Sequence, residues 1–93
     1  MKPKIGEQIW CVYQDQIIKE TVEFLGKESF IIEGYEYKYD AEYEYKYYNE
    51  DWFKNLEKAK KSLLKKNSGK KVKIIKISDF IYQLVGEDEE WQR

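Results

Sequence analysis

The chain contains 93 residues, of which 42% are hydrophobic and 38% are charged, and its formal net charge at pH 7 is −1. This length leaves room for one hydrophobic core, and the balance of apolar and charged residues excludes intrinsically disordered and membrane-embedded proteins. No apolar run approaches the roughly 20 residues that a membrane-crossing helix needs, and residues 1–6 lack the apolar stretch of a secretory signal. We therefore expect a soluble domain in the cytoplasm, with no membrane partner.

Residue usage restricts the chemistry further. The chain has no histidine, so a catalytic triad of the Ser-His-Asp or Cys-His type cannot be built. Cys11 is the single cysteine, which allows neither an internal disulfide nor a thiolate metal cluster. The five glycines are too scattered for a phosphate-binding loop. We expect a protein that is not an enzyme and uses no cofactor or metal, in which Cys11 is a small buried hydrophobic residue.

Three antiparallel strands are expected at the start of the chain. Their segments are rich in β-branched and aromatic residues and are separated by polar or glycine-containing turns: 8–13, 17–25 and 29–33. In the second segment Val22 and Phe24 alternate with Thr21 and Glu23, and this period of two is typical of a strand.

The next segment alternates tyrosine with charged residues. Every second position carries an aromatic ring or alanine, namely Tyr35, Tyr37, Tyr39, Ala41, Tyr43, Tyr45 and Tyr47. An extended chain would place these side chains on one face. Thirteen residues exceed the usual strand length, which favours a reversal centred on Ala41 that pairs Tyr39 with Tyr43; one long bent strand is the alternative. Such a face fits either the wall of a barrel or an exposed recognition patch.

A helix is predicted over about 50–67. Asn49 is expected to cap a short first turn and Asn55 to cap the main part. One side carries an apolar stripe that would pack on the sheet, consisting of Trp52, Phe53, Leu56, Ala59, Leu63 and Leu64. The opposite side carries a solvated lysine ridge, consisting of Lys54, Lys58, Lys61 and Lys65. After Ser68 and Gly69 the runs K-V-K-I-I-K-I and F-I-Y-Q-L-V predict a terminal hairpin.

These elements predict an α+β fold: a small antiparallel SH3-like barrel or curled sheet of five to seven strands, packed on one helix. The single domain is expected to span residues 1–86, followed by an acidic tail at 87–93. An open α+β sheet is the alternative.

Charge is distributed unevenly along the chain. Residues 33–51 carry seven acidic side chains against two lysines, whereas residues 54–76 carry ten lysines against one glutamate. Two candidate surfaces of opposite sign follow. The protein-binding candidates are Tyr35, Tyr37, Tyr39, Asp40, Glu42, Tyr43, Glu44 and Tyr45. The nucleic-acid-binding candidates are Lys58, Lys61, Lys65, Lys70, Lys71 and Lys73.

Nucleic-acid binding is the weaker of these two hypotheses. Lysine neutralises phosphate without reading sequence, and arginine, the usual reader of base edges, occurs only at Arg93. The tyrosines that could stack on bases lie in the acidic segment and not among the lysines. A row of carboxylates beside aromatic rings instead suits a basic protein groove.

The runs G-E-Q-I-W-C-V-Y and E-D-W-F-K-N-L-E-K-A-K-K-S-L-L give the chain a resemblance to small uncharacterised proteins of phages and mobile elements in low-GC bacteria. In those proteins a Gly-acid-x-Val-Tyr strand opens an SH3-like or KOW-like barrel, and an acid-x-Phe-x-Thr-x-Glu-Glu-Ala segment begins a helix. Here Asn55 replaces the threonine and Lys58 replaces one glutamate. The resemblance covers about two-thirds of the chain and brings no catalytic residues.

Proteins of this kind include inhibitors of host defence, anti-CRISPR proteins among them. The resemblance and the acidic tyrosine segment together favour an inhibitor that binds a host protein, such as a nucleic-acid-binding defence protein. The first alternative is a KOW-like adaptor that binds nucleic acid through its lysines. The second is a self-associating module in which the tyrosine face meets its own copy, so that the protein is a monomer or a homodimer.

Overall fold

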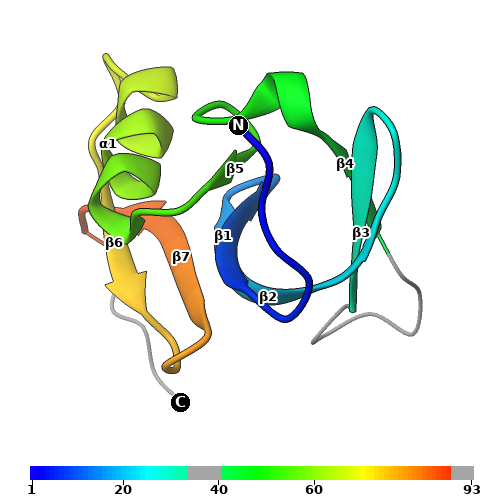
Figure 1. Ribbon diagram of the computed structural model, residues 1–93. Helices are drawn as coiled ribbons and strands as arrows, with labels where there is room; N and C mark the ends of the chain where they lie inside the picture. Colours follow the sequence, from blue (N-terminus) through cyan, green and yellow to red (C-terminus); the bar gives the residue numbers. More distant parts are fainter. Residues whose placement is uncertain (34–40, 89–93) are drawn as a thin grey trace.

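A computed structural model of the chain describes residues 1–33 and 41–88 (Figure 1). The elements, in chain order, are β1 (Gln8–Tyr13), β2 (Gln16–Leu25), β3 (Ser29–Glu33), β4 (Ala41–Glu44), the 3₁₀ turn η1 (Tyr45–Tyr47), β5 (Trp52–Phe53), α1 (Leu56–Lys66), β6 (Val72–Lys76) and β7 (Ile81–Gly86). All the strand pairings between these elements are antiparallel. The expected small α+β fold, a curled antiparallel sheet with one helix, is confirmed.

The sheet is a meander that curls back on itself. Neighbouring strands follow the order β4-β3-β2-β1-β5, and the terminal β6–β7 hairpin joins through β7, which pairs with the start of β2. The indole Nε1 of Trp52 donates a hydrogen bond to the backbone oxygen of Glu44 at 3.0 Å, and this bond links the two ends of the five-strand order. The sheet therefore forms a half-barrel with an inner and an outer face.

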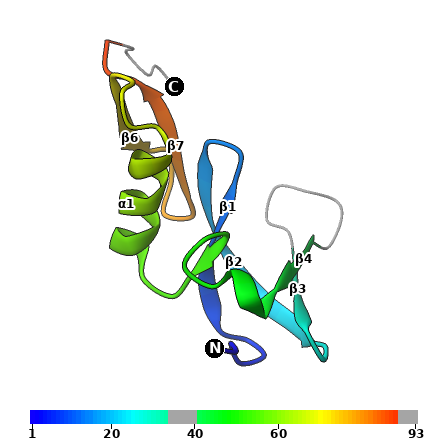
Figure 2. The same cartoon turned by 90° about the horizontal axis from the view of Figure 1, so that it is seen from above.

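The half-barrel and the helix lie on opposite sides of the β1–β2 pair. Figure 1 shows β3 and β4 curling round one side, with α1, β6 and β7 on the other side, and the view from above in Figure 2 shows the same separation. The helix packs against β1, β5 and β6. It therefore covers only part of the outer face of the sheet.

The buried apolar residues form two clusters, where the sequence predicted one core. The inner cluster lies within the curl and consists of Ile9, Cys11, Val22, Phe30, Ile32, Tyr45 and Trp52. The outer cluster lies beneath the helix and the terminal hairpin and consists of Ile17, Phe53, Ala59, Leu63, Tyr82 and Leu84. Strand β1 contributes to both, because Ile9 and Cys11 belong to the inner cluster whereas Trp10 and Val12 pack against the outer one.

Strand β5 serves both clusters with only two residues. Trp52 is 0% exposed in the inner cluster and Phe53 is 1% exposed in the outer cluster. The prediction that both belong to the helical stripe is wrong, because they pair with Cys11 and Trp10 of β1 as a strand. Consecutive residues of a strand point to opposite faces, which lets these two rings fill different clusters.

A bulge in β2 breaks the alternation of Val22 and Phe24. The pairing with β3 shifts register between Val22 and Phe24. Val22 is 1% exposed on the inner face, whereas Phe24 is 56% exposed. One inserted residue reverses the side to which all later residues of a strand point, so Phe24 turns outward and Leu25 packs against the inner cluster.

The main helix begins and ends where predicted, but its first turn does not form. The side-chain oxygen of Asn55 accepts a hydrogen bond from the backbone N–H of Lys58 at 3.1 Å, and Asn67 is the C-cap. Residues 50–55 are not helical, since Asn49 adopts a positive φ of 66° and the chain then enters β5. Ala59 and Leu63 are buried as expected, whereas Leu64 is exposed.

The predicted tyrosine hairpin spans residues 35–47. Residues 35–40 lie outside the described part of the chain. The prediction of a reversal centred on Ala41 is wrong. Ala41 opens β4 and pairs with Ile32 of β3, and Tyr43 pairs with Phe30 of β3. The alternation also ends before Tyr47, since Tyr45–Tyr47 form the turn η1.

Candidate protein-binding face

The outer sides of β3 and β4 form an acidic face. Antiparallel register places Glu42 opposite Ile31 and Glu44 opposite Ser29, so these four side chains share one side of the sheet. The intervening residues Phe30, Ile32 and Tyr43 belong to or pack against the inner cluster on the other side. We call this outer surface, with the neighbouring Glu28 and Glu33 and with Phe24 of β2, the acidic face.

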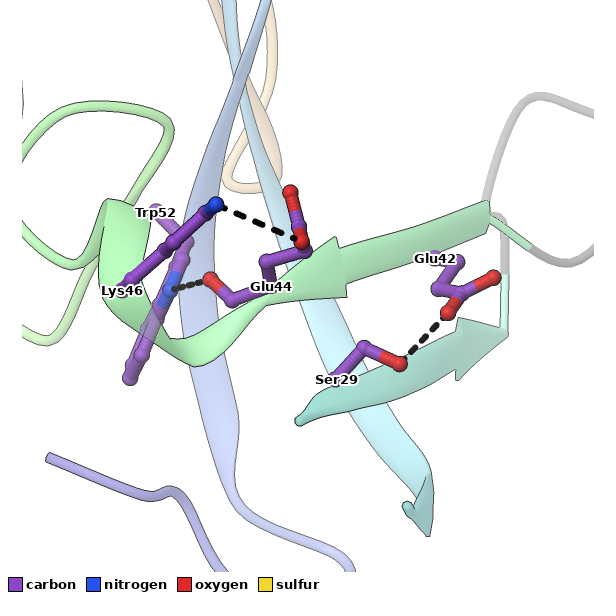
Figure 3. A network of polar contacts seen from close by, with 5 residues as sticks. All are labelled: Ser29, Glu42, Glu44, Lys46 and Trp52. Carbon is purple, nitrogen blue, oxygen red and sulfur yellow. Dashed lines mark hydrogen bonds and ion pairs between the residues drawn. The ribbon is translucent and has the colours of Figure 1, made fainter. Parts of the chain in front are cut away.

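Three carboxylates of the acidic face surround one shallow hollow. Its lining consists of Glu28, Ser29, Glu42 and Glu44. Figure 3 shows the contacts on this side of the sheet: the Ser29 hydroxyl donates to Glu42 Oε1, and Lys46 Nζ lies 3.8 Å from Glu44 Oε1. Both side chains of that ion pair are strongly exposed, so water screens the attraction between them. The lining of this hollow is acidic, and Lys27 and Lys46 line the adjoining one together with Glu28, Glu44 and Tyr45.

The acidic face also contains an apolar pair. Phe24 of β2 lies opposite Ile31 of β3, which in turn lies opposite Glu42 of β4. Phe24 is exposed and Ile31 is half-buried. No sequence pattern indicates this pair, because it depends on the bulge that turns Phe24 away from the core.

The structure separates the predicted tyrosines from the predicted carboxylates. Tyr45 is buried in the inner cluster, where its hydroxyl donates to the backbone oxygen of Gly26 at 2.7 Å and its ring stacks on Phe30. Tyr43 is half-buried and faces the same cluster. Glu42 and Glu44 are exposed on the opposite side of the sheet. The remaining candidates, Tyr35, Tyr37, Tyr39 and Asp40, lie outside the described residues.

The inner face contains a group of titratable side chains. Cys11 is buried, as predicted, and desolvation together with the charge of Glu20 raises the pKa of its thiol. Desolvation also raises the pKa of the Tyr43 hydroxyl, with contributions from Cys11 and Glu20. Glu20 itself is buried. The Cys11 thiol is thus held protonated, which makes it a poor nucleophile.

The six lysines proposed for nucleic-acid binding do not form one surface. Lys58, Lys61 and Lys65 lie on the side of α1 that faces away from Ala59 and Leu63. Lys70 and Lys71 lie in the connection that follows the helix. Lys73 points to the other side of β6, because its neighbours Val72 and Ile74 pack against the outer cluster beneath the helix.

The six candidate lysines differ in their contacts from the other four lysines of residues 54–76. Lys54 pairs with Glu7 at 3.3 Å and Lys76 pairs with Asp79 at 2.9 Å. Lys60 lies over the ring of Tyr82 and pairs with Glu57, and Lys66 donates to the backbone of Glu50. Within residues 1–33 and 41–88 none of the six candidates forms an ion pair, and all six are exposed.

No group of three or more Cys, Asp or Glu side chains in the described parts of the chain is arranged to hold a metal ion. Among these residues there is also no helix with the length and apolarity needed to cross a bilayer. No protein-family description matches the chain, and no curated protein or solved structure is significantly similar to it.

Proposed function

We propose that the chain is a non-catalytic module that binds a basic protein through its acidic face. The observation that carries this proposal is the hollow on β3 and β4, where Glu28, Glu42 and Glu44 converge and remain exposed. Clustered carboxylates raise the rate of encounter with a positively charged partner and disfavour partners of the same sign.

The proposed partner is a host protein whose basic groove normally receives nucleic acid. Carboxylates on alternate residues of a strand, such as Glu42 and Glu44, present regularly spaced negative charges that occupy such a groove in place of phosphates. The resemblance to small phage proteins supports an inhibitor of host defence, of the anti-CRISPR type, acting in the bacterial cytoplasm.

We further propose that strands β1 to β5 form the barrel of an SH3-like domain. The meander of β1 to β4 supports this, because neighbouring strands of such a barrel follow one another in the chain. The return of β5 to pair with β1 and the hydrogen bond from Trp52 to Glu44 both draw the sheet toward closure.

The test is charge reversal on the acidic face. Glu42→Lys with Glu44→Lys should abolish capture of a basic protein from nuclease-treated host lysate while the far-UV circular dichroism spectrum is unchanged. The matched control is Glu57→Lys with Glu87→Lys, which alters net charge equally at exposed positions outside the face. Capture that survives reversal of Glu42 and Glu44 would sink the proposal, as would recovery of nucleic acid alone without nuclease.

A second candidate function is nucleic-acid binding through α1. It is favoured by the exposed row of Lys58, Lys61 and Lys65, which form no ion pairs with the other described residues. It predicts affinity for DNA or RNA that falls steeply with salt and that drops when all three lysines become glutamine. Undetectable binding at low ionic strength would remove this candidate.

A further inference from the structure

Phe24 is 56% exposed at the β2 side of the acidic face, although the fold has two apolar clusters that bury other aromatic rings. The bulge in β2 directs Phe24 outward, opposite Ile31, and at the same time directs Leu25 toward the inner cluster. Phe24 therefore cannot enter the inner cluster without a change of register in β2. Its exposure follows from the backbone and not from a rotamer of the side chain.

Carboxylates lie beside this apolar pair within the sheet. Glu42 lies directly opposite Ile31 on β4, and Glu33 lies two residues beyond Ile31 on the same side of β3. Glu23 precedes Phe24 in the bulged segment and is exposed. An aromatic centre within a charged rim is the anatomy of a protein-binding surface, where the apolar centre provides most of the affinity and the rim selects the partner.

The signs of these charges select one kind of occupant. Nucleic acid and anionic lipid are repelled by the carboxylates. A second copy of the chain, related by a two-fold axis, would bring two acidic faces together, and juxtaposed like charges oppose association. The remaining occupant is a lysine- or arginine-rich protein segment that carries an apolar side chain.

We propose that Phe24 and Ile31 are the anchoring centre of the acidic face, and that the partner places one apolar side chain, flanked by basic residues, against them. This inference rests on the proposed function and adds to it the chemistry of the recognised segment.

The experiment uses two synthetic peptides, Lys-Lys-Leu-Lys-Lys and Lys-Lys-Ser-Lys-Lys, titrated against the full chain at low salt. The leucine peptide should bind about tenfold more tightly than the serine peptide. Phe24→Ser should reduce this preference to about twofold or less and leave the affinity for the serine peptide unchanged. Tyr13→Ser is the matched control, because Tyr13 is an aromatic residue of comparable exposure, 47%, outside the acidic face, and it should keep the preference.

The outcomes separate this inference from the proposed function. Equal affinity for both peptides, lost on reversal of Glu42 and Glu44, would refute the apolar anchor and leave the acidic face intact. Binding that is indifferent to that reversal would refute both. Concentration-dependent dimerisation that Phe24→Ser abolishes, measured by sedimentation velocity, would show that a second copy occupies the surface and would overturn the proposal.

Discussion

The two halves of the outer face carry similar residues and have opposite surroundings. In the covered half, Trp10, Val12 and Ile17 lie beneath α1 and the terminal hairpin. In the bare half, Phe24 and Ile31 lie among carboxylates. The difference shows that burial on this sheet is decided by where later segments of the chain dock, and that the charges beside an exposed ring determine which partner it can accept.

The largest expected effect compares one phenylalanine from each half. Phe53→Ala should lower the free energy of unfolding by about 3–5 kcal/mol, because the ring is fully buried in the outer cluster. Phe24→Ala should change it by about 0.5 kcal/mol or less, because the ring already contacts water. Urea unfolding measures both, and Phe53→Leu serves as a milder variant if the alanine variant does not fold. A cost above about 1 kcal/mol for Phe24→Ala would contradict the contrast.

The buried Cys11 thiol on the inner face predicts that the free energy of unfolding depends on pH. Below the ordinary thiol pKa of 9.0, Cys11 is protonated in the folded and the unfolded chain, so its titration does not affect stability. Above this value the unfolded thiol ionises while burial and Glu20 keep the folded thiol protonated. Stability should therefore fall with rising pH, by about 1 kcal/mol over the first pH unit above 9.0.

Cys11→Ala should remove this part of the pH dependence. The measurement is the slope of unfolding free energy over the first pH unit above 9.0, in both proteins. Equal slopes would show that the thiol is accessible in the folded chain.

Helix α1 lies over the outer cluster, and Asn55 caps its first turn. Asn55→Ala removes the side-chain acceptor for the Lys58 N–H at the start of α1 and should cost about 1 kcal/mol. Asn55→Ser, which retains a capping oxygen, should recover most of that loss. Thermal unfolding measures the effect, and an unchanged midpoint in the alanine variant would indicate that packing alone fixes the helix start.

Short sequence patterns correctly predicted the elements that depend mainly on neighbouring residues in the chain. The apolar run at 8–13 gave the bounds of β1, Asn55 gave the start of the helix, and the two apolar runs after Gly69 gave the terminal hairpin. Trp52 and Phe53 were assigned to the helix because their strand exists only through pairing with β1, which is distant in sequence. The outward turn of Phe24 depends on one bulged residue, and period-two reasoning does not detect a bulge.

The acidic face was therefore only partly predictable. Glu42 and Glu44 were named as candidates, and the structure brings them together in one exposed hollow. The tyrosines beside them were named as part of the same binding surface, although the period of two places Tyr43 on the other side of the strand from Glu42 and Glu44. The turn η1 follows directly, and Tyr45 is buried in the inner cluster with Tyr43 packed against it.

The smallest expected effect concerns the charges of the bare half. Glu42→Gln with Glu44→Gln should raise the free energy of unfolding by a few tenths of a kcal/mol, because it relieves repulsion around the hollow. Added salt should reduce the difference, since ions screen exposed charges. Urea unfolding at two salt concentrations measures it, and clear destabilisation would show that the Ser29–Glu42 hydrogen bond supports the strand pair.

Strand β5 is only two residues long, yet each of its rings completes a different cluster. If β5 separates from β1, both clusters lose an aromatic side chain together. Neither cluster should therefore unfold while the other stays intact. The half-barrel and the helix with its hairpin should accordingly behave as one cooperative unit, with the slowest hydrogen exchange at the amides of β1 and a single calorimetric transition.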